Sequence, residues 1–196
     1  MTDSTSSLIW NRNHIISTPD TLISNSAGGQ VSADSNFQAA AAVMLDVPSP
    51  TAFLNTNYTN STTSLTNVGD LNFTLAKSQA YAFRCELYYQ AAATGGLQVG
   101  FSGPATNSFI YGVEIATDNG TGTPYNTGVG TALATKIPTA SVAVAKAATN
   151  YVAHVSGSIN PSAVGVLQLQ AASAAAATLT VNRGSYCKLY SQSSFQ

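Results

Sequence analysis

Few residues of this 196-residue chain have the types and spacing that chemistry requires. The two histidines, His14 and His154, have no Cys, Asp or Glu near them at metal-ligand spacing. We favour a structural role for His154, which falls within a strand-like run. The sequence also lacks a G-x-S-x-G elbow, a phosphate loop, a dinucleotide fingerprint and an H-E-x-x-H helix. We therefore expect no cofactor and no metal.

Glu86 and Glu114 are the candidate pair for acid and base catalysis among the eight acidic residues. Glycoside hydrolysis uses two carboxyl groups about 5–10 Å apart, and these two could meet if their strands were neighbours. Both lie on the polar faces of their expected strands, where a solvated or Lys-paired carboxylate is the common case. A small hydrolase is therefore the third hypothesis, and we expect no catalytic residue.

Cys85 and Cys187 both fall inside apolar, strand-like runs. There the favoured interpretation is a small buried hydrophobic side chain. A disulfide or a metal site remains the alternative.

Nine tyrosines make up the largest aromatic group. A tyrosine packs a ring and keeps a hydrogen-bonding end, which suits cores, subunit interfaces and sugar-binding platforms. We favour packing. The Gly/Thr/Asn-rich segment Asp118–Gly130 is predicted to be a surface loop, as a slack connection in preference to an interaction loop. Tyr125 is the candidate contact if this loop does bind a partner.

Short runs of alternating apolar and polar residues, separated by turn residues, predict strands along most of the chain. In the clearest run, Tyr81–Tyr89, the odd-numbered residues form an apolar face, and Arg84 and Glu86 point the other way. Further strands are expected at 97–101, 109–115, 151–159, 164–169, 179–181 and 186–190.

These strands predict an all-β fold, an antiparallel β-sandwich of jelly-roll type, over residues 51–196. Residues 37–50 are a connector with mixed helix and strand signals. Residues 1–36 are predicted to form an extended N-terminal arm, polar but with apolar clusters. The arm residues that we expect to contact a partner are Leu8, Ile9, Trp10, Ile15 and Ile16.

Charged residues make up only 8 % of the chain, against about 25 % in an ordinary protein. Such a surface has little electrostatic self-repulsion, which favours association. A net charge of −1 with seven scattered Lys and Arg gives little support to nucleic-acid or anionic-membrane binding. The first residues, MTDSTSS, lack the pattern of a signal peptide, so we expect synthesis in the cytoplasm without export by the general secretory route.

Several segments together resemble a recurrent module of tailed-bacteriophage structural proteins. Its Thr-rich strand and Tyr-x-Phe-x-x-x-Leu strand correspond to Asn60–Leu65, Asp70–Leu75 and Ala80–Gln90. A G-x-x-x-x-F/V-x-G-P segment follows at Gly96–Pro104, and Gly184–Leu189 closes the module. This family consists of decoration (cement) proteins, head fibres and tail-fibre parts, commonly trimeric jelly rolls. It brings no catalytic residues to carry over.

The resemblance implies a non-catalytic virion structural protein. We expect a capsid decoration protein on the capsid exterior, which forms a homotrimer, binds the major capsid protein and stabilises the head shell. The alternative is a tail-associated or fibre module that recognises a host glycan.

Overall fold

The structure is a computed structural model that describes most of the chain from Ser49 onward. The described residues are 24–25 and 31–32, as backbone only, and 49–117, 125–139, 143–144 and 146–192. The predicted arm contacts Leu8, Ile9, Trp10, Ile15 and Ile16 lie outside these residues. Most of the predicted arm (1–36) and connector (37–50) also lies outside the described residues, so the boundaries of these two segments stay predictions.

Two units make up the chain, Met1–Pro48 and Ser49–Gln196. In the first unit, β1 (Ser24–Asn25) pairs antiparallel with β2 (Val31–Ser32).

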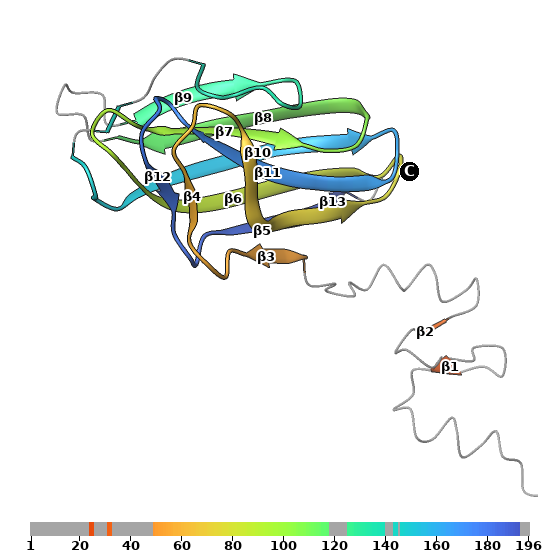
Figure 1. Ribbon diagram of the computed structural model, residues 1–196. Coiled ribbons are helices and arrows are strands. Elements are labelled where there is room, and N and C mark those ends of the chain that lie inside the picture. The colour runs from red at the N-terminus through yellow and green to blue at the C-terminus, as the bar shows by residue number, and fades with distance from the viewer. Residues whose placement is uncertain are drawn as a thin grey trace, which may run out of the picture. The chain divides into compact units, whose positions relative to one another are not determined.

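In the described residues of the second unit, strands are the only regular secondary structure (Figure 1). In chain order they are β3 (Thr51–Phe53), β4 (Tyr58–Asn60), β5 (Thr66–Leu75), β6 (Ala80–Ala91), β7 (Leu97–Ser102), β8 (Thr106–Ala116), β9 (Tyr125–Gly130), β10 (Tyr151–Pro161), β11 (Gly165–Ser173), β12 (Leu179–Val181) and β13 (Tyr186–Gln192). Because Tyr125–Gly130 forms β9, paired with β8, the predicted loop from Asp118 is wrong in its second half. Gly and Thr suggested a loop there, but pairing with a long neighbour overrides such local preference.

The strands form two antiparallel sheets. The large sheet has eight strands, in the order β3-β13-β6-β10-β8-β9, with β12 pairing both β6 and β4. The small sheet has three, in the order β5-β11-β7. The prediction of an all-β antiparallel sandwich is confirmed.

Four antiparallel pairs join early strands to late ones: β3 with β13, β4 with β12, β5 with β11, and β6 with β10. Nested pairing of this kind is how a long hairpin rolls into a jelly roll. The innermost pair departs from it, because β7 and β8 belong to different sheets and β8 pairs with β10. The jelly-roll part of the fold prediction therefore stays a prediction.

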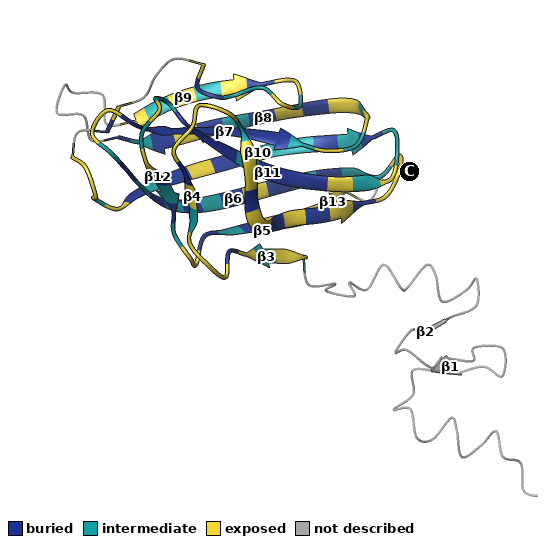
Figure 2. Cartoon of the chain, viewed as in Figure 1, coloured by how far each residue is buried: buried dark blue, intermediate teal, exposed yellow. Residues whose placement is uncertain are grey.

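The core is formed by the inward faces of both sheets, and Figure 2 shows buried residues alternating with exposed ones along several strands. Aromatic rings fill its centre, where Phe101 contacts both Phe83 and Tyr111 at centroid distances of 5.0 and 5.1 Å. The Tyr111 hydroxyl donates to the backbone oxygen of Thr135 at 2.7 Å. Burial raises the pKa of Tyr111 to about 12, so it stays a hydrogen-bond donor at neutral pH.

Cys85 and Cys187 are joined by a disulfide inside this core. They lie directly opposite each other on β6 and β13, and each is 1 % exposed. The prediction that they are buried is confirmed, but the preference for unpaired side chains is wrong. Sequence spacing could not reveal that two strands separated by 102 positions are neighbours.

Other segments of the chain approach the strands of the small sheet closely, and one such approach requires a glycine. A Cβ on Gly100 would lie 2.6 Å from Leu65 and 2.8 Å from the Thr135 oxygen, so the segment around Thr135 can cover β7 only if residue 100 is glycine. On β11, the oxygen of Ala171 accepts hydrogen bonds from Tyr58 and Asn60, both at 3.1 Å.

Candidate functional site

The residues most able to bind a ligand or take part in a reaction lie on the outward face of the large sheet. The register across the sheet aligns Tyr186 of β13, Glu86 of β6, His154 of β10 and Glu114 of β8 in one row. All four side chains are at least partly exposed, since their neighbours along each strand point into the core.

The hydrolase hypothesis required Glu86 and Glu114 to lie on neighbouring strands, but they do not. Strand β10 runs between them with His154 opposite both, so their backbones are two strand spacings, or about 10 Å, apart.

Glu86 is held by two tyrosine hydroxyls. Tyr88 donates to its Oε1, and Tyr186 donates to its Oε2 at 3.2 Å. The hydrogen bond from Tyr88 is the main cause that lowers the pKa of Glu86; the bond from Tyr186 and the nearby His154 and Arg84 add to it, against the opposing effect of desolvation. A general acid needs a raised pKa, so this environment opposes that role for Glu86.

Two cations stand side by side on the same face. Arg84 of β6 and Lys188 of β13 are exposed and lie directly opposite each other in register. Like charges in this position destabilise a sheet. The Lys188 Nζ lies 6.0 Å from the centroid of the Tyr186 ring. Both cations face solvent, and Arg84 interacts electrostatically with Glu86.

Two hollows lie next to each other on this face. The first, which we call the basic hollow, has a volume of about 370 Å³ and is lined chiefly by Arg84, Glu86, His154, Tyr186, Lys188 and Tyr190. The second, the adjoining hollow, has about 450 Å³ and includes Gly112, Glu114, Val129 and Ser156. Arg84 and His154 line both. Cavities of about 300–1,000 Å³ are usual for small-molecule sites.

Small residues form the floor of the adjoining hollow. Ser156 lies between Arg84 and Gly112 in register. A Cβ on Gly112 would have only the Gly128 oxygen, at 3.9 Å, within contact range, so neither packing nor a left-handed backbone requires glycine there. A strand glycine costs about 0.5–1 kcal/mol relative to alanine, and it often marks a place where a ligand approaches.

Apolar side chains surround the hollows. Five of the seven large apolar side chains that are exposed among the described residues point outward from the large sheet: Phe53, Ile110, Tyr125, Val129 and Tyr190. The other two, Val164 and Val166, lie at the start of β11 and just before it. Tyr125, predicted as a loop contact, is 49 % exposed but lies on β9.

The strands of the small sheet carry almost no charge. Across β5, β7 and β11 the only charged residue is Asp70, whose Oδ2 accepts a hydrogen bond from Asn55 at 2.9 Å. The outward residues of β5 are otherwise Thr, Asn and Gly.

Within the described residues, no group of three or more His, Cys, Asp and Glu is arranged to hold a metal ion. The same residues include no helix long and apolar enough to span a membrane. Sequence reasoning had singled out Glu86, Glu114 and His154, and Tyr186 among the strand tyrosines, but it missed Lys188 and Gly112. Alternation in β13 would have placed Lys188 outward, but nothing local shows that Arg84 faces it.

Comparison of the sequence with models of known protein families finds no match. Comparison with curated proteins finds none either.

Proposed function

We propose that this chain is a non-catalytic structural protein of a virus particle, a decoration protein that binds and stabilises the head shell as a homotrimer. The observation that carries the proposal is the nearly uncharged small sheet, with Val164 and Val166 exposed, in a chain with only 8 % charged residues. Protein interfaces are depleted in charge at their centres, so this face suits contact with other subunits.

The two outward faces differ in what burial would cost. To cover the large sheet, a partner would have to desolvate Arg84 and Lys188, which lie opposite each other, and desolvation of charges is unfavourable. To cover the small sheet, it would desolvate Asp70 and, in the segment beside β7, Lys136, whose Nζ donates to the Thr63 oxygen at 2.9 Å. We therefore assign the small sheet to contact with other copies or the major capsid protein. Binding only to assembled shells would stabilise them by mass action.

Gold-labelled antibody against the protein, applied to intact particles, tests this function by electron microscopy. Label spread over the head is the expected result. Label confined to the tail tip would favour receptor recognition instead, and particles without label would contradict a virion role.

The proposed arm contact has its own test. A variant without residues 1–36 should keep the circular dichroism of the sandwich but lose binding to shells that lack the protein. A variant without residues 1–7 retains Leu8, Ile9, Trp10, Ile15 and Ile16 and should still bind. Full binding by the longer deletion would contradict the role of the arm.

A second candidate function is recognition of a host glycan. It is favoured by the hollows on the large sheet, where Tyr186 and Tyr190 offer rings beside polar groups. This function needs no catalytic group and is compatible with a place on the particle surface.

A further inference from the structure

We infer that the basic hollow, together with the adjoining hollow, binds a saccharide that carries a carboxylate, with Arg84 and Lys188 holding the acid group. This inference rests on the second candidate function and specifies its site and its ligand class. It does not depend on where the protein sits in the particle.

The charge pattern favours binding of an anion. Arg84 and Lys188 are exposed, directly opposite in register and of like sign, an arrangement that weakens the sheet in the absence of a counter-charge. Among the described residues, Glu86 is the single carboxylate that lines the hollow with these two cations; it interacts electrostatically with Arg84 and accepts hydrogen bonds from Tyr88 and Tyr186. A carboxylate in the hollow would neutralise the pair, and the planar guanidinium of Arg84 can bind it with two parallel hydrogen bonds.

The surroundings of the cations suit a sugar ring. Tyr186 is oriented by its bond to Glu86 and lies beside Lys188, while Tyr190 lines the same hollow. These rings give an apolar surface with hydrogen-bonding ends. Glu86 acts here as a positioning residue, because it holds the Tyr186 side chain and does not itself need to touch the ligand.

The adjoining hollow gives room for the rest of the saccharide. Its floor, at Gly112 and Ser156, carries almost no side-chain bulk, and Glu114 and His154 on its wall can bond to hydroxyl groups. Since Gly112 is not required by packing, a larger side chain there would fill the hollow and leave the fold intact.

The first test is an array of oligosaccharides, applied to the purified full chain. It should include sialylated and glucuronate-bearing oligosaccharides, each with a neutral counterpart, and the affinity of any hit should be measured by calorimetry. We expect binding to acidic saccharides and at least tenfold weaker binding to the neutral ones. No acidic hit, or equal binding of the neutral counterparts, would overturn the inference.

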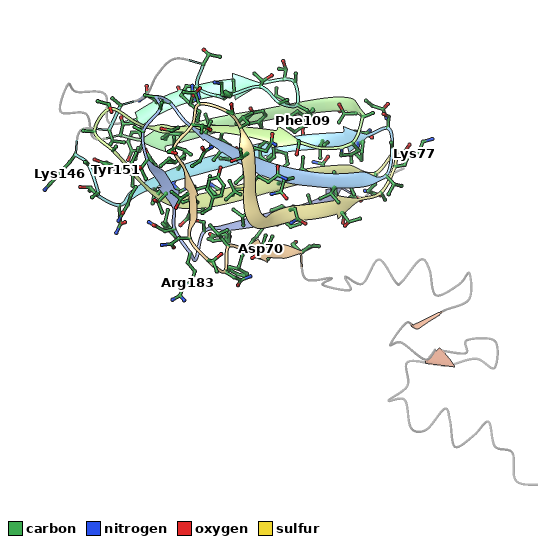
Figure 3. The ribbon with its side chains drawn as sticks, in the orientation of Figure 1. Asp70, Lys77, Phe109, Lys146, Tyr151 and Arg183 are labelled. Carbon is green, nitrogen blue, oxygen red and sulfur yellow. A yellow bond between two sulfur atoms is a disulfide. The ribbon has the colours of Figure 1, made fainter. Side chains whose placement is uncertain are left out.

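Two variants connect the binding to this site. Lys188→Glu should weaken binding at least tenfold, and its melting temperature should be equal or higher, because Arg84 then faces an opposite charge. Gly112→Gln should weaken binding similarly with the fold retained. Lys77→Glu, with the same charge change at an end of the sandwich (Figure 3), and Thr74→Gln, on the small sheet, are the controls and should bind normally.

The outcomes separate this inference from the proposed functions. An acidic glycan that binds Lys188→Glu and Gly112→Gln normally would overturn the site but keep glycan recognition. Equal binding of a polyglutamate peptide would overturn the saccharide assignment. Gold label on the head would support decoration in either case.

Discussion

The outward faces of the two sheets differ in charge although they belong to one small sandwich. The large sheet presents Arg84, Glu86, Glu114 and Lys188 around two hollows, and the small sheet presents Asp70. Of the other described cations, Lys77 and Lys146 lie at opposite ends of the sandwich (Figure 3). Four of the nine charged residues in the described part of the chain thus lie on one face, while Lys136 lies in the segment beside β7.

Under the proposed function, this difference places charge where a ligand would be recognised and leaves little charge where a protein partner would cover the surface. Association through the small sheet would desolvate few ions, while the ions of the large sheet remain in water in the absence of a ligand. The same core supports both faces, because period-2 alternation lets each strand serve the core on one side and a partner on the other.

The largest effect is expected at the disulfide that supports the charged face. Cys85 and Cys187 link β6 and β13 beneath the basic hollow and close a loop with a sequence separation of 102. Reduction should lower the free energy of unfolding by about 4.7 kcal/mol in the chain-entropy account. The chain has no other cysteine, so denaturant unfolding with and without reductant isolates this link. Equal midpoints would contradict its stabilising role.

A matched pair of substitutions tests the assignment of the uncharged face. Val166 on β11 is 48 % exposed, and Ile110 on β8 is 49 % exposed, so they differ mainly in the face they occupy. Val166→Lys should weaken subunit or shell association by on the order of 3 kcal/mol, because it buries an unpaired charge.

Light scattering and shell-binding assays measure this effect, and Ile110→Lys should leave association unchanged. If Ile110→Lys dissociates the assembly and Val166→Lys does not, the faces have been assigned the wrong way round.

A smaller effect is expected from the like-charged pair in the absence of ligand. Lys188→Glu should raise the free energy of unfolding by about 0.2–1 kcal/mol, because an opposite-charge pair replaces the repulsion with Arg84. Chemical denaturation at low salt measures the change, and added salt should reduce it. A loss of stability would show that Lys188 has a structural role that the charge argument omits.

The smallest effect concerns the pH dependence of the charged face. The hydrogen bond from Tyr88 keeps the pKa of Glu86 below its ordinary value of 4.5. The stability that Glu86 contributes is therefore fully present above pH 4.5 and is lost as the pH falls through its lower folded-state pKa. Tyr88→Phe should raise this pKa toward 4.5, as measured by NMR titration. An unchanged pKa would assign the shift to other neighbours.

The sequence predicted which side of a strand each side chain points to better than it predicted which strands pair with each other. Alternation in Tyr81–Tyr89 correctly sends Arg84 and Glu86 outward, because side-chain direction is a local property with a period of two. Which strands become neighbours depends on how the whole core packs. Local reasoning could therefore not predict that Arg84 lies opposite Lys188 in register, or that a strand separates Glu86 from Glu114.

The same limit explains the disulfide and β9. Cys85 and Cys187 look like ordinary buried side chains until β13 is placed beside β6. In β9, glycines that read as loop residues serve close packing, since a Cβ on Gly130 would lie 2.3 Å from the Tyr111 ring. The hollow at Gly112 could not be foreseen, because its meaning depends on the residues across the sheet.

The central claim is that the small sheet faces the particle and the large sheet faces outward. Hydroxyl-radical footprinting of the protein, free and bound to purified particles, tests it most directly. The account predicts that Val164 and Val166 become protected on particles while Tyr186 and Tyr190 remain reactive. Protection of Tyr186 and Tyr190 with Val164 and Val166 still reactive would contradict it.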